Sequence, residues 1–436
     1  MRDQRSAWWM GIAIGAFTAA VSAADYSVGG ADLSISAFGT LGYAISDQPY
    51  SYQRFIDDSG TFQRDSLVGL QVDARFNSNI GATIQLKVAP KTSSDSGYEV
   101  TVPWAFVSFR PTNDWLIRVG KQRIPFYLYS ETVDVGVTYE FARLPTEMYS
   151  IITSNDFAGL SIGKTWSLES GEVSLDGYWG MAETDYRYWV RDDIPPFQTP
   201  GAIFWAEDIT AGGIVLSYRT EQDTYRIGVH RGTGEWKDDR LFVKTFPFVP
   251  LAPGIGYYQV NDLLPGPGVP TMPSITGTVV TLGAAIGLGA GFRLVGEFAQ
   301  STFEDTDVSQ ASRRGYVSVL KRAGNWTPYV TYAFLRSPAV ERDFYRAVNY
   351  NTVPAFVPGA TLINASQRIA TDMFPIWDQY SVAIGTSYAF SATSKAKAEV
   401  LRTRVGQVSS LIDAPSFGNI RNEGITVFSL SYNFVF

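Results

Sequence analysis

Hydrophobic and polar residues alternate strictly along many short segments of this chain. In segment 67–76, Leu70 and Val72 fall on one face, whereas Gln71 and Asp73 fall on the other. A period of two is the pattern of a β-strand, in which successive side chains point to opposite sides. Because the pattern recurs along the chain, it predicts an all-β fold with one apolar and one polar face.

The connections between these segments differ in length in a regular way. Short links alternate with long ones, which is typical of an outer-membrane β-barrel with turns at one rim and loops at the other. A soluble β-sandwich instead has long and short loops at both ends. The short links are 77–79, 111–114, 220–224, 288–290, 323–324 and 391–394; the long ones are 46–65, 124–156, 180–210, 232–274, 337–378 and 405–424, with shorter loops near 89–98 and 301–312.

The alternating segments number about sixteen, which predicts a transmembrane antiparallel β-barrel. They are 31–45, 66–76, 80–88, 99–110, 115–123, 157–165, 171–180, 211–219, 225–232, 275–287, 291–300, 313–322, 325–336, 379–390, 395–404 and 425–436. Fourteen or eighteen strands remain open, since boundaries read from sequence err by a few residues. A barrel of roughly sixteen strands leaves an aqueous lumen, whereas about eight strands are filled by side chains.

Composition excludes several other classes of protein. The net charge of −7 and the lack of basic clusters argue against nucleic-acid binding. No apolar run after residue 24 is long enough for a membrane-spanning helix. Aromatic residues near the predicted strand ends suit the interface belts of a membrane protein; they are Trp104, Trp115, Trp166, Trp179, Trp326 and Tyr432.

The N-terminus has the order of a secretory signal. Arg2 and Arg5 precede the apolar run 8–21, and small residues around Ala23 offer a cleavage site. We expect residues 1–24 to be a cleaved signal peptide, and residues 25–436 to form one barrel domain in a Gram-negative outer membrane.

Two segments resemble outer-membrane porins. The chain ends in SYNFVF, and the terminal Phe436 is similar to the signal that the barrel-insertion machinery recognises. The stretch Arg110–Tyr149 resembles the central part of proteobacterial general porins, in which a loop folds into the barrel. The resemblance implies a homotrimer in contact with outer-membrane lipid and lipopolysaccharide that passes small hydrophilic solutes and ions by passive diffusion.

The predicted loop 124–156 is long and unusually apolar, which indicates packing against an inner wall. Its acids are expected to face basic residues across a narrow water passage, where such charges sort ions by sign. The candidate loop acids are Glu131, Asp134, Glu140 and Glu147; the candidate bases are Arg75, Lys87, Arg118, Arg123 and Arg143, of which Arg123 and Arg143 flank the loop.

Three alternatives accompany this interpretation. A channel specific for sugars, phosphate or other small anions is the nearest, and a sugar channel would use inward aromatics such as Tyr178, Tyr316 and Tyr329. An outer-membrane enzyme would depend on His230, the single histidine, but no Gly-x-Ser-x-Gly motif accompanies it. A soluble carbohydrate-binding protein leaves the loop asymmetry unexplained. No metal, phosphate or cofactor motif occurs, so we expect no catalysis and no cofactor.

Overall fold

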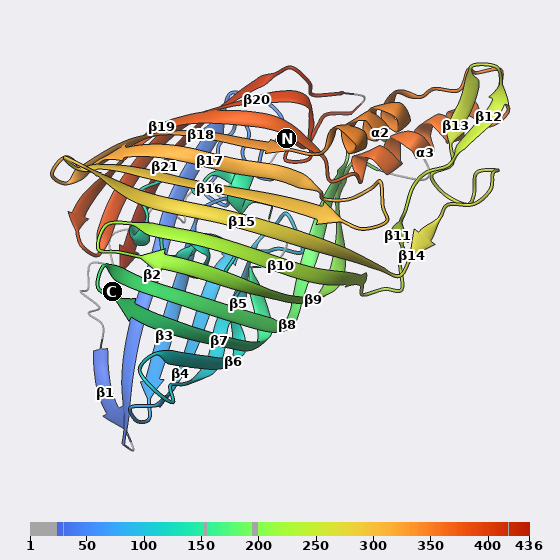
Figure 1. The fold of residues 1–436 in the computed structure, drawn as a ribbon. Coiled ribbons are helices and arrows are strands. Elements are labelled where there is room, and N and C mark those ends of the chain that lie inside the picture. Colours follow the sequence, from blue (N-terminus) through green and yellow to red (C-terminus); the bar gives the residue numbers. More distant parts are fainter. Residues whose placement is uncertain (1–23, 29, 152–154, 194–198, 417) are drawn as a thin grey trace.

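The protein is described by a computed structural model that covers residues 24–28, 30–151, 155–193, 199–416 and 418–436. One antiparallel sheet closes into a barrel (Figure 1). Its strands are β2 (Ala31–Ser46), β3 (Leu67–Arg75), β4 (Ile80–Pro90), β5 (Tyr98–Phe109), β6 (Trp115–Arg123), β7 (Asp156–Leu168), β8 (Gly171–Val190), β9 (Gly201–Arg219), β10 (Thr224–Trp236), β15 (Ser274–Gly289), β16 (Phe292–Phe303), β17 (Ser312–Lys321), β18 (Trp326–Arg336), β19 (Trp377–Ser391), β20 (Ser394–Ser409) and β21 (Gly424–Val435).

The barrel closes between its first and last long strands. β21 pairs with β2 from Val435 opposite Phe38 to Val427 opposite Ser46. The short strand β1 (Ala24–Val28) pairs with the beginning of β2, beyond the end of β21. Setting β1 aside, the closed barrel has sixteen strands, which confirms the predicted number and the all-β fold.

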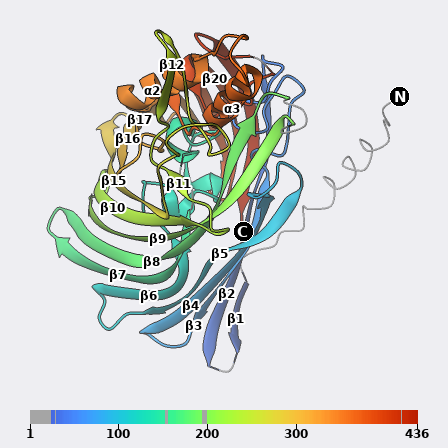
Figure 2. The ribbon, with the colours of Figure 1, turned by 90° about the vertical axis from the view of Figure 1, so that its right-hand side faces the viewer.

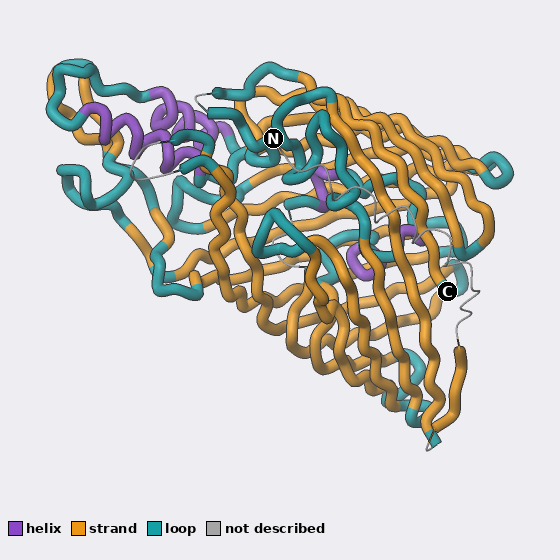
Figure 3. The backbone as a smooth tube through the Cα atoms, turned by 180° about the vertical axis from the view of Figure 1, so that it is seen from behind, coloured by secondary structure: helices purple, strands orange, loops and turns teal. Residues whose placement is uncertain are grey.

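The two rims of the barrel differ as the link lengths predict. At one rim, tight turns such as 169–170 and 392–393 join neighbouring strands, and both ends of the described chain lie at this rim. At the other rim, the longest connections are 124–155, 237–273 and 337–376. Figure 3 shows the helices and much of the loop at one end of the strands, and further loop inside the barrel.

The outer face of the barrel carries an apolar belt. Leu70, Ile84, Val119 and Ile214 are exposed on successive parts of the sheet, whereas Gln71 and Gln85, next to Leu70 and Ile84, point into the lumen and are hydrogen-bonded to each other. An apolar surface of this kind is stable against lipid and unfavourable against water. Trp115, Trp166, Trp179, Trp326 and Tyr432 are exposed on the strands, as the belt of interface aromatics requires.

Trp104 does not belong to this aromatic belt, so the prediction that it is an interface aromatic is wrong. A β-bulge in β5 shifts the pairing between Gln85 opposite Trp104 and Lys87 opposite Thr101. The additional residue reverses the alternation of β5, since side chains change face at every residue. Trp104 therefore lies on the lumen side, with its ring 5.6 Å from that of Phe106.

The hairpin of β8 and β9 is longer than the sequence predicts. β8 continues to Val190 and β9 begins at Gly201, so most of the predicted loop 180–210 is paired strand. Both faces of this extension have partners, because Tyr186 packs on Trp236 while Trp189 Nε1 donates to the carbonyl of Ala414 at 2.9 Å. Because both faces are covered, apolar and polar residues do not alternate simply here, and the sequence prediction depends on that alternation.

A lobe projects from the long-loop rim (Figure 1). It contains α2 (Ala339–Tyr350), α3 (Ala360–Asp372) and the short strands β11 (Phe242–Val243), β12 (Phe248–Ala252), β13 (Ile255–Tyr258) and β14 (Thr271–Met272). Phe246, Tyr345, Val348 and Phe374 form its larger core. The sequence analysis predicts 337–378 only as a long loop and misses both helices. No helix in the described residues is long and apolar enough to cross a membrane.

Candidate pore constriction

The connection between β6 and β7 folds into the barrel rather than over its mouth (Figure 2). It contains three short helical turns: η2 (Ser130–Thr132), η3 (Gly136–Thr138) and α1 (Thr146–Tyr149). We call residues 124–151 of this connection the constriction loop. Its position confirms the inward-folded loop predicted from its length and apolar composition.

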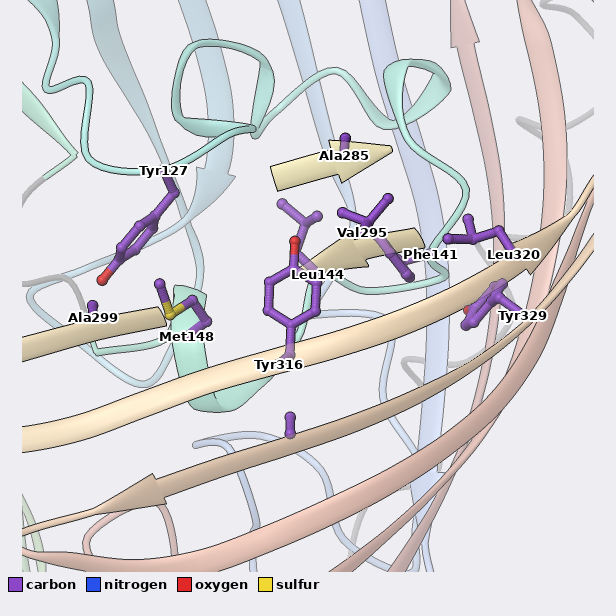
Figure 4. Close-up of a cluster of buried hydrophobic side chains, with 11 residues drawn as sticks. Tyr127, Phe141, Leu144, Met148, Ala285, Val295, Ala299, Tyr316, Leu320 and Tyr329 are labelled. Carbon is purple, nitrogen blue, oxygen red and sulfur yellow. The ribbon is translucent and has the colours of Figure 1, made fainter. Parts of the chain in front are cut away.

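Apolar packing holds one side of the constriction loop against the wall formed by β15–β18. Phe141 lies edge-on to Tyr329, with ring centroids 5.2 Å apart, and also to Tyr316 at 6.1 Å. Figure 4 shows Leu144 and Met148 of the loop beside these rings. The buried side chains of this loop–wall cluster are Tyr127, Phe141, Leu144, Met148, Ala285, Val295, Ala299, Tyr316, Leu320, Tyr329 and Ala333.

Two buried wall glutamates fix the backbone of the loop on the same side. Glu297 accepts hydrogen bonds from the Leu128 amide and the Tyr316 hydroxyl, both at 2.7 Å. Glu399 accepts a bond from the Tyr329 hydroxyl, which in turn accepts the Ala142 amide at 2.8 Å. Because a buried carboxylate is costly without partners, these bonds select one docked position of the loop.

Asp134 binds two bases of the opposite wall. Its carboxylate lies 3.0 Å from Lys87 Nζ on β4 and also pairs with Arg123 at the end of β6. Arg123 pairs with Asp156 at the start of β7 as well. These side chains are largely buried, so the group forms a compact ion-pair network between loop and wall.

Two further loop acids contact bases on separate strands. Glu131 lies 3.4 Å from Arg118 Nη1, and about half of the Glu131 side chain (48%) remains exposed to the lumen. Glu140 lies 2.6 Å from Lys395 Nζ on β20 and accepts a bond from Ser387. Burial alone would raise the pKa of Glu140, but the bonds from Lys395 and Ser387 outweigh it and lower this pKa below its usual value.

The acids and bases therefore meet in direct contact instead of facing one another across water. Such pairs chiefly position the loop, since the field of a contact pair largely cancels at a distance. Arg118 and Glu131 form the most exposed of these four loop–wall ion pairs.

Three predicted charges lie elsewhere than expected. Arg143 is on the constriction loop itself, where it binds Asp65 of loop 47–66. Glu147 is 1% exposed and accepts a bond from Gln379 Nε2 at 2.9 Å, so it does not border the passage. Arg75 ends β3 beside a tight turn, opposite Asp32, and in the described part of the chain it forms no ion pair with the loop.

Lys395 and Lys397 of β20 are contacts that sequence reasoning missed. Lys397 Nζ donates to the carbonyls of Gly136 at 2.6 Å and Phe141 at 2.9 Å, and it lies 4.0 Å from the centre of the Tyr139 ring. The sequence does carry a signal for them: Lys395, Lys397 and Glu399 alternate with alanine or valine, which places all three on the lumen face.

A cavity of about 820 Å³ extends from the constriction loop toward the long-loop rim. Its lining combines Arg54 and Arg64 of loop 47–66, Lys121 and Arg123 of β6, and Asp134 of the constriction loop. The extended hairpin reaches over this cavity, where Arg187 binds Asp413 with Nη1 and Oδ1 2.7 Å apart. The space is thus a polar vestibule with charges of both signs.

Comparison with known proteins finds similarity in structure. The structure is similar to that of the outer-membrane expressed OmpT of Vibrio cholerae, with 10% sequence identity and a TM-score of 0.50. The alignment covers 95% of this chain and 100% of that chain. The shared fold is an outer-membrane β-barrel. The anion-selective porin of Comamonas acidovorans (11% identity, 93% and 100% coverage, TM-score 0.48) and the channel DcaP of Acinetobacter baumannii (11%, 95% and 100%, 0.49) also match.

No model of a protein family matches this sequence, and no curated protein matches it either. At these identities, the similarity to OmpT shows the barrel fold alone. The candidate functions must therefore be weighed by the residues inside this barrel.

The three inward tyrosines predicted for a sugar channel, Tyr178, Tyr316 and Tyr329, do not lie next to one another along the lumen. Tyr316 and Tyr329 are buried beneath the constriction loop, whereas Tyr178 packs near His230 on another part of the wall. His230 is buried, with Nδ1 2.9 Å from the Tyr178 hydroxyl and Nε2 3.4 Å from the Thr281 hydroxyl. Among the described residues, no three His, Cys, Asp or Glu side chains are grouped as metal ligands.

Proposed function

We propose that this chain forms a water-filled channel in the Gram-negative outer membrane for passive diffusion of small hydrophilic solutes and ions. The observation that carries the proposal is a sixteen-stranded barrel that holds an inward loop with a polar vestibule of about 820 Å³ beside it. A barrel of this strand number has room for water beside such a loop.

The charges around the vestibule favour weak selectivity. Cationic groups such as Arg54 and Lys121 share its lining with Asp134 and Asp156. A channel specific for phosphate would instead concentrate arginines along one wall. A channel specific for sugars would need adjacent aromatic platforms, and Tyr178 lies apart from Tyr316 and Tyr329.

Planar-bilayer conductance of the detergent-extracted protein tests the proposal. We expect stable openings in salt, a small reversal potential under a salt gradient, and current that no single solute abolishes. Openings in groups of three would support the proposed homotrimer. Block by one sugar or anion would establish the specific channel instead, and a folded barrel without conductance would overturn the channel function.

The route to the membrane is also a proposal. The expected signal peptide, residues 1–24, falls almost wholly in residues 1–23, outside the described residues. We expect the mature chain to begin at Ala24 or Asp25, which mass spectrometry of the N-terminal peptide checks. Phe436 lies in the closing seam, where its amide donates to the Ala37 carbonyl at 2.8 Å, and we expect its deletion to slow insertion by the barrel-insertion machinery.

We propose that the barrel is not an enzyme. A histidine acting as general base needs a nucleophile on one side and commonly a carboxylate on the other. The hydrogen-bonding partners of His230 are the hydroxyls of Tyr178 and Thr281. We expect His230→Gln to leave conductance unchanged; hydrolytic activity of the purified chain that this variant loses would contradict the proposal.

A further inference from the structure

A second, smaller cavity lies in the inner wall beside the constriction loop. Its volume is about 130 Å³, and strands β8–β10 and β15–β17 surround it. Phe126 of the loop and Tyr178, Ile209 and Ile275 of the wall give it a mainly apolar lining. We call this cavity the side pocket. A dry cavity of about 150 Å³ in another protein holds benzene, so the side pocket has the size for one ring or a short alkyl chain.

Glycines create the space of the side pocket. Gly232, Gly234 and Gly277 lie on its lining in β10 and β15. A Cβ at Gly234 would overlap the carboxylate of Glu207, and one at Gly277 would meet the ring of Phe303. At Gly232, by contrast, a Cβ would have its nearest neighbours at 3.5 Å, an ordinary contact. Gly232 therefore accommodates a Cβ in ordinary contact, and a larger side chain at this position would extend into the pocket.

Glu207 places an unsatisfied carboxylate oxygen at this pocket. The residue is 2% exposed, and its carboxylate accepts a hydrogen bond from the Tyr186 side chain. Its Oε2 atom is buried and has no hydrogen-bond partner among the described residues. A buried acceptor without a donor is energetically unfavourable, and more so when the group is charged. A ligand that supplies the donor recovers this cost.

We propose that the side pocket binds a small organic ammonium ion with an apolar or aromatic body. The ammonium would donate to Glu207 Oε2, and the body would occupy the space left by the glycines. The rings of Phe126, Tyr178 and Tyr186 line the same pocket, and aromatic faces attract a cation. An inorganic cation would gain nothing from the apolar lining.

An anionic ligand does not fit the same site. Arg314 also lines the pocket, but Nε is 3.1 Å from the Tyr127 hydroxyl and Nη1 is 2.8 Å from the Ser312 hydroxyl. This guanidinium is thus engaged in fixing the constriction loop and β17. The carboxylate of Glu207 would repel an anion placed in the pocket.

The test uses the full chain in detergent and 2-phenylethylamine as the probe. Calorimetry and ligand-observed NMR measure the binding of the probe. We expect saturable binding at one site, and about tenfold weaker binding of 2-phenylethanol, which has the same body without the charge. Glu207→Gln should weaken binding of the amine by about tenfold, and Gly232→Leu should abolish it.

Asp208→Asn is the matched control, because Asp208 follows Glu207 but lies on the opposite face of β9 and pairs with Lys237. It should bind the amine as the unmodified chain does. Retention of a folded, heat-modifiable barrel on gels validates each variant, and Gly232→Ala replaces Gly232→Leu where the latter does not fold. Equal binding of amine and alcohol, or full binding by Glu207→Gln, would overturn the proposal. The titration needs no current, so its outcome is independent of channel activity.

Discussion

Arg143 and Asp65, which are 78 residues apart in the sequence, form a two-pronged ion pair inside the barrel. Arg143 Nε donates to Asp65 Oδ1 at 2.8 Å, and Nη2 donates to Oδ2. Burial would raise the pKa of Asp65, but Arg143 overcomes this effect and holds that pKa below its usual value. The pair therefore stays charged at neutral pH and ties the constriction loop to loop 47–66.

We expect Arg143→Met to destabilise this connection by about 3–5 kcal/mol, because Asp65 is left as a buried charge without its counter-ion. The visible result should be noisier single-channel current and a lower thermal midpoint. Adding Asp65→Asn should recover part of the loss. Arg75→Met, at the rim, is the control and should change neither the current noise nor the thermal midpoint. Unchanged current noise in Arg143→Met would show that the pair does not hold the loop.

Arg118 and Glu131 should set opposite ion preferences when either is neutralised. Arg118→Gln leaves the lumen-exposed acid and should raise cation over anion permeability roughly twofold, since exposed charges interact weakly, by about 0.5 kcal/mol. Glu131→Gln should shift the reversal potential by a similar amount in the other direction. The double variant should return toward the original value, and two shifts of the same sign would refute the assignment.

Leu70 and Gln71 test which face of β3 meets lipid. Leu70 is exposed on the outer face, whereas Gln71 Nε2 donates to Asp73 Oδ2 inside the lumen at 2.8 Å. Leu70→Arg should cost about 2–4 kcal/mol of folding free energy in bilayers, the cost of a charge near the bilayer midplane. Gln71→Arg should cost less than 1 kcal/mol, about the scale of a solvated substitution. Equal costs in urea-unfolding titrations would contradict the assigned faces.

Glu341 should make the projecting lobe sensitive to pH. Burial raises its pKa to about 7, and its Oε2 is buried without a partner in the described structure. An unfolded glutamate ionises near 4.5, so lobe stability should fall as pH rises from 4.5 to 7 and level off above, by roughly 1–2 kcal/mol.

Hydrogen exchange of the α2 amides, corrected for its intrinsic pH dependence, measures this change. Glu341→Gln should flatten it, while Asp343→Asn, an exposed acid of the same helix, should leave it in place. A pH response that persists in Glu341→Gln would assign it to another group.

The barrel was predictable because lipid on one side and water on the other impose a period of two. Residues such as Leu70 and Gln71 satisfy that rule without help from distant contacts. The rule fails where the alternation is interrupted or where both faces are buried. A bulge in β5 turns Trp104 to the lumen face, and both faces of the β8–β9 extension are covered. The helices α2 and α3 were missed within a segment predicted only as a long loop.

The inward constriction loop could be predicted from the sequence, but its individual ion pairs could be predicted only in part. Length and apolar content predict an inward loop. Asp134 is predicted as one of its acids, whereas strand parity predicts Lys87 and Arg118 as bases of the wall. Which acid meets which base depends on cross-barrel placement, and so Lys395 was overlooked while Arg75 was included. Glu147 shows the same limit, since sequence alone does not distinguish a buried acid from one beside water.

The attachment of the constriction loop to β20 has a consequence for the order of assembly. Glu140 and Lys395 are 255 residues apart, and Lys397 holds two carbonyls of the same loop. Contacts this distant in the chain form late, after the intervening loops have closed. An incompletely synthesised chain has the loop but not its anchor, so the narrow point of the barrel is finished only when the C-terminal strands arrive.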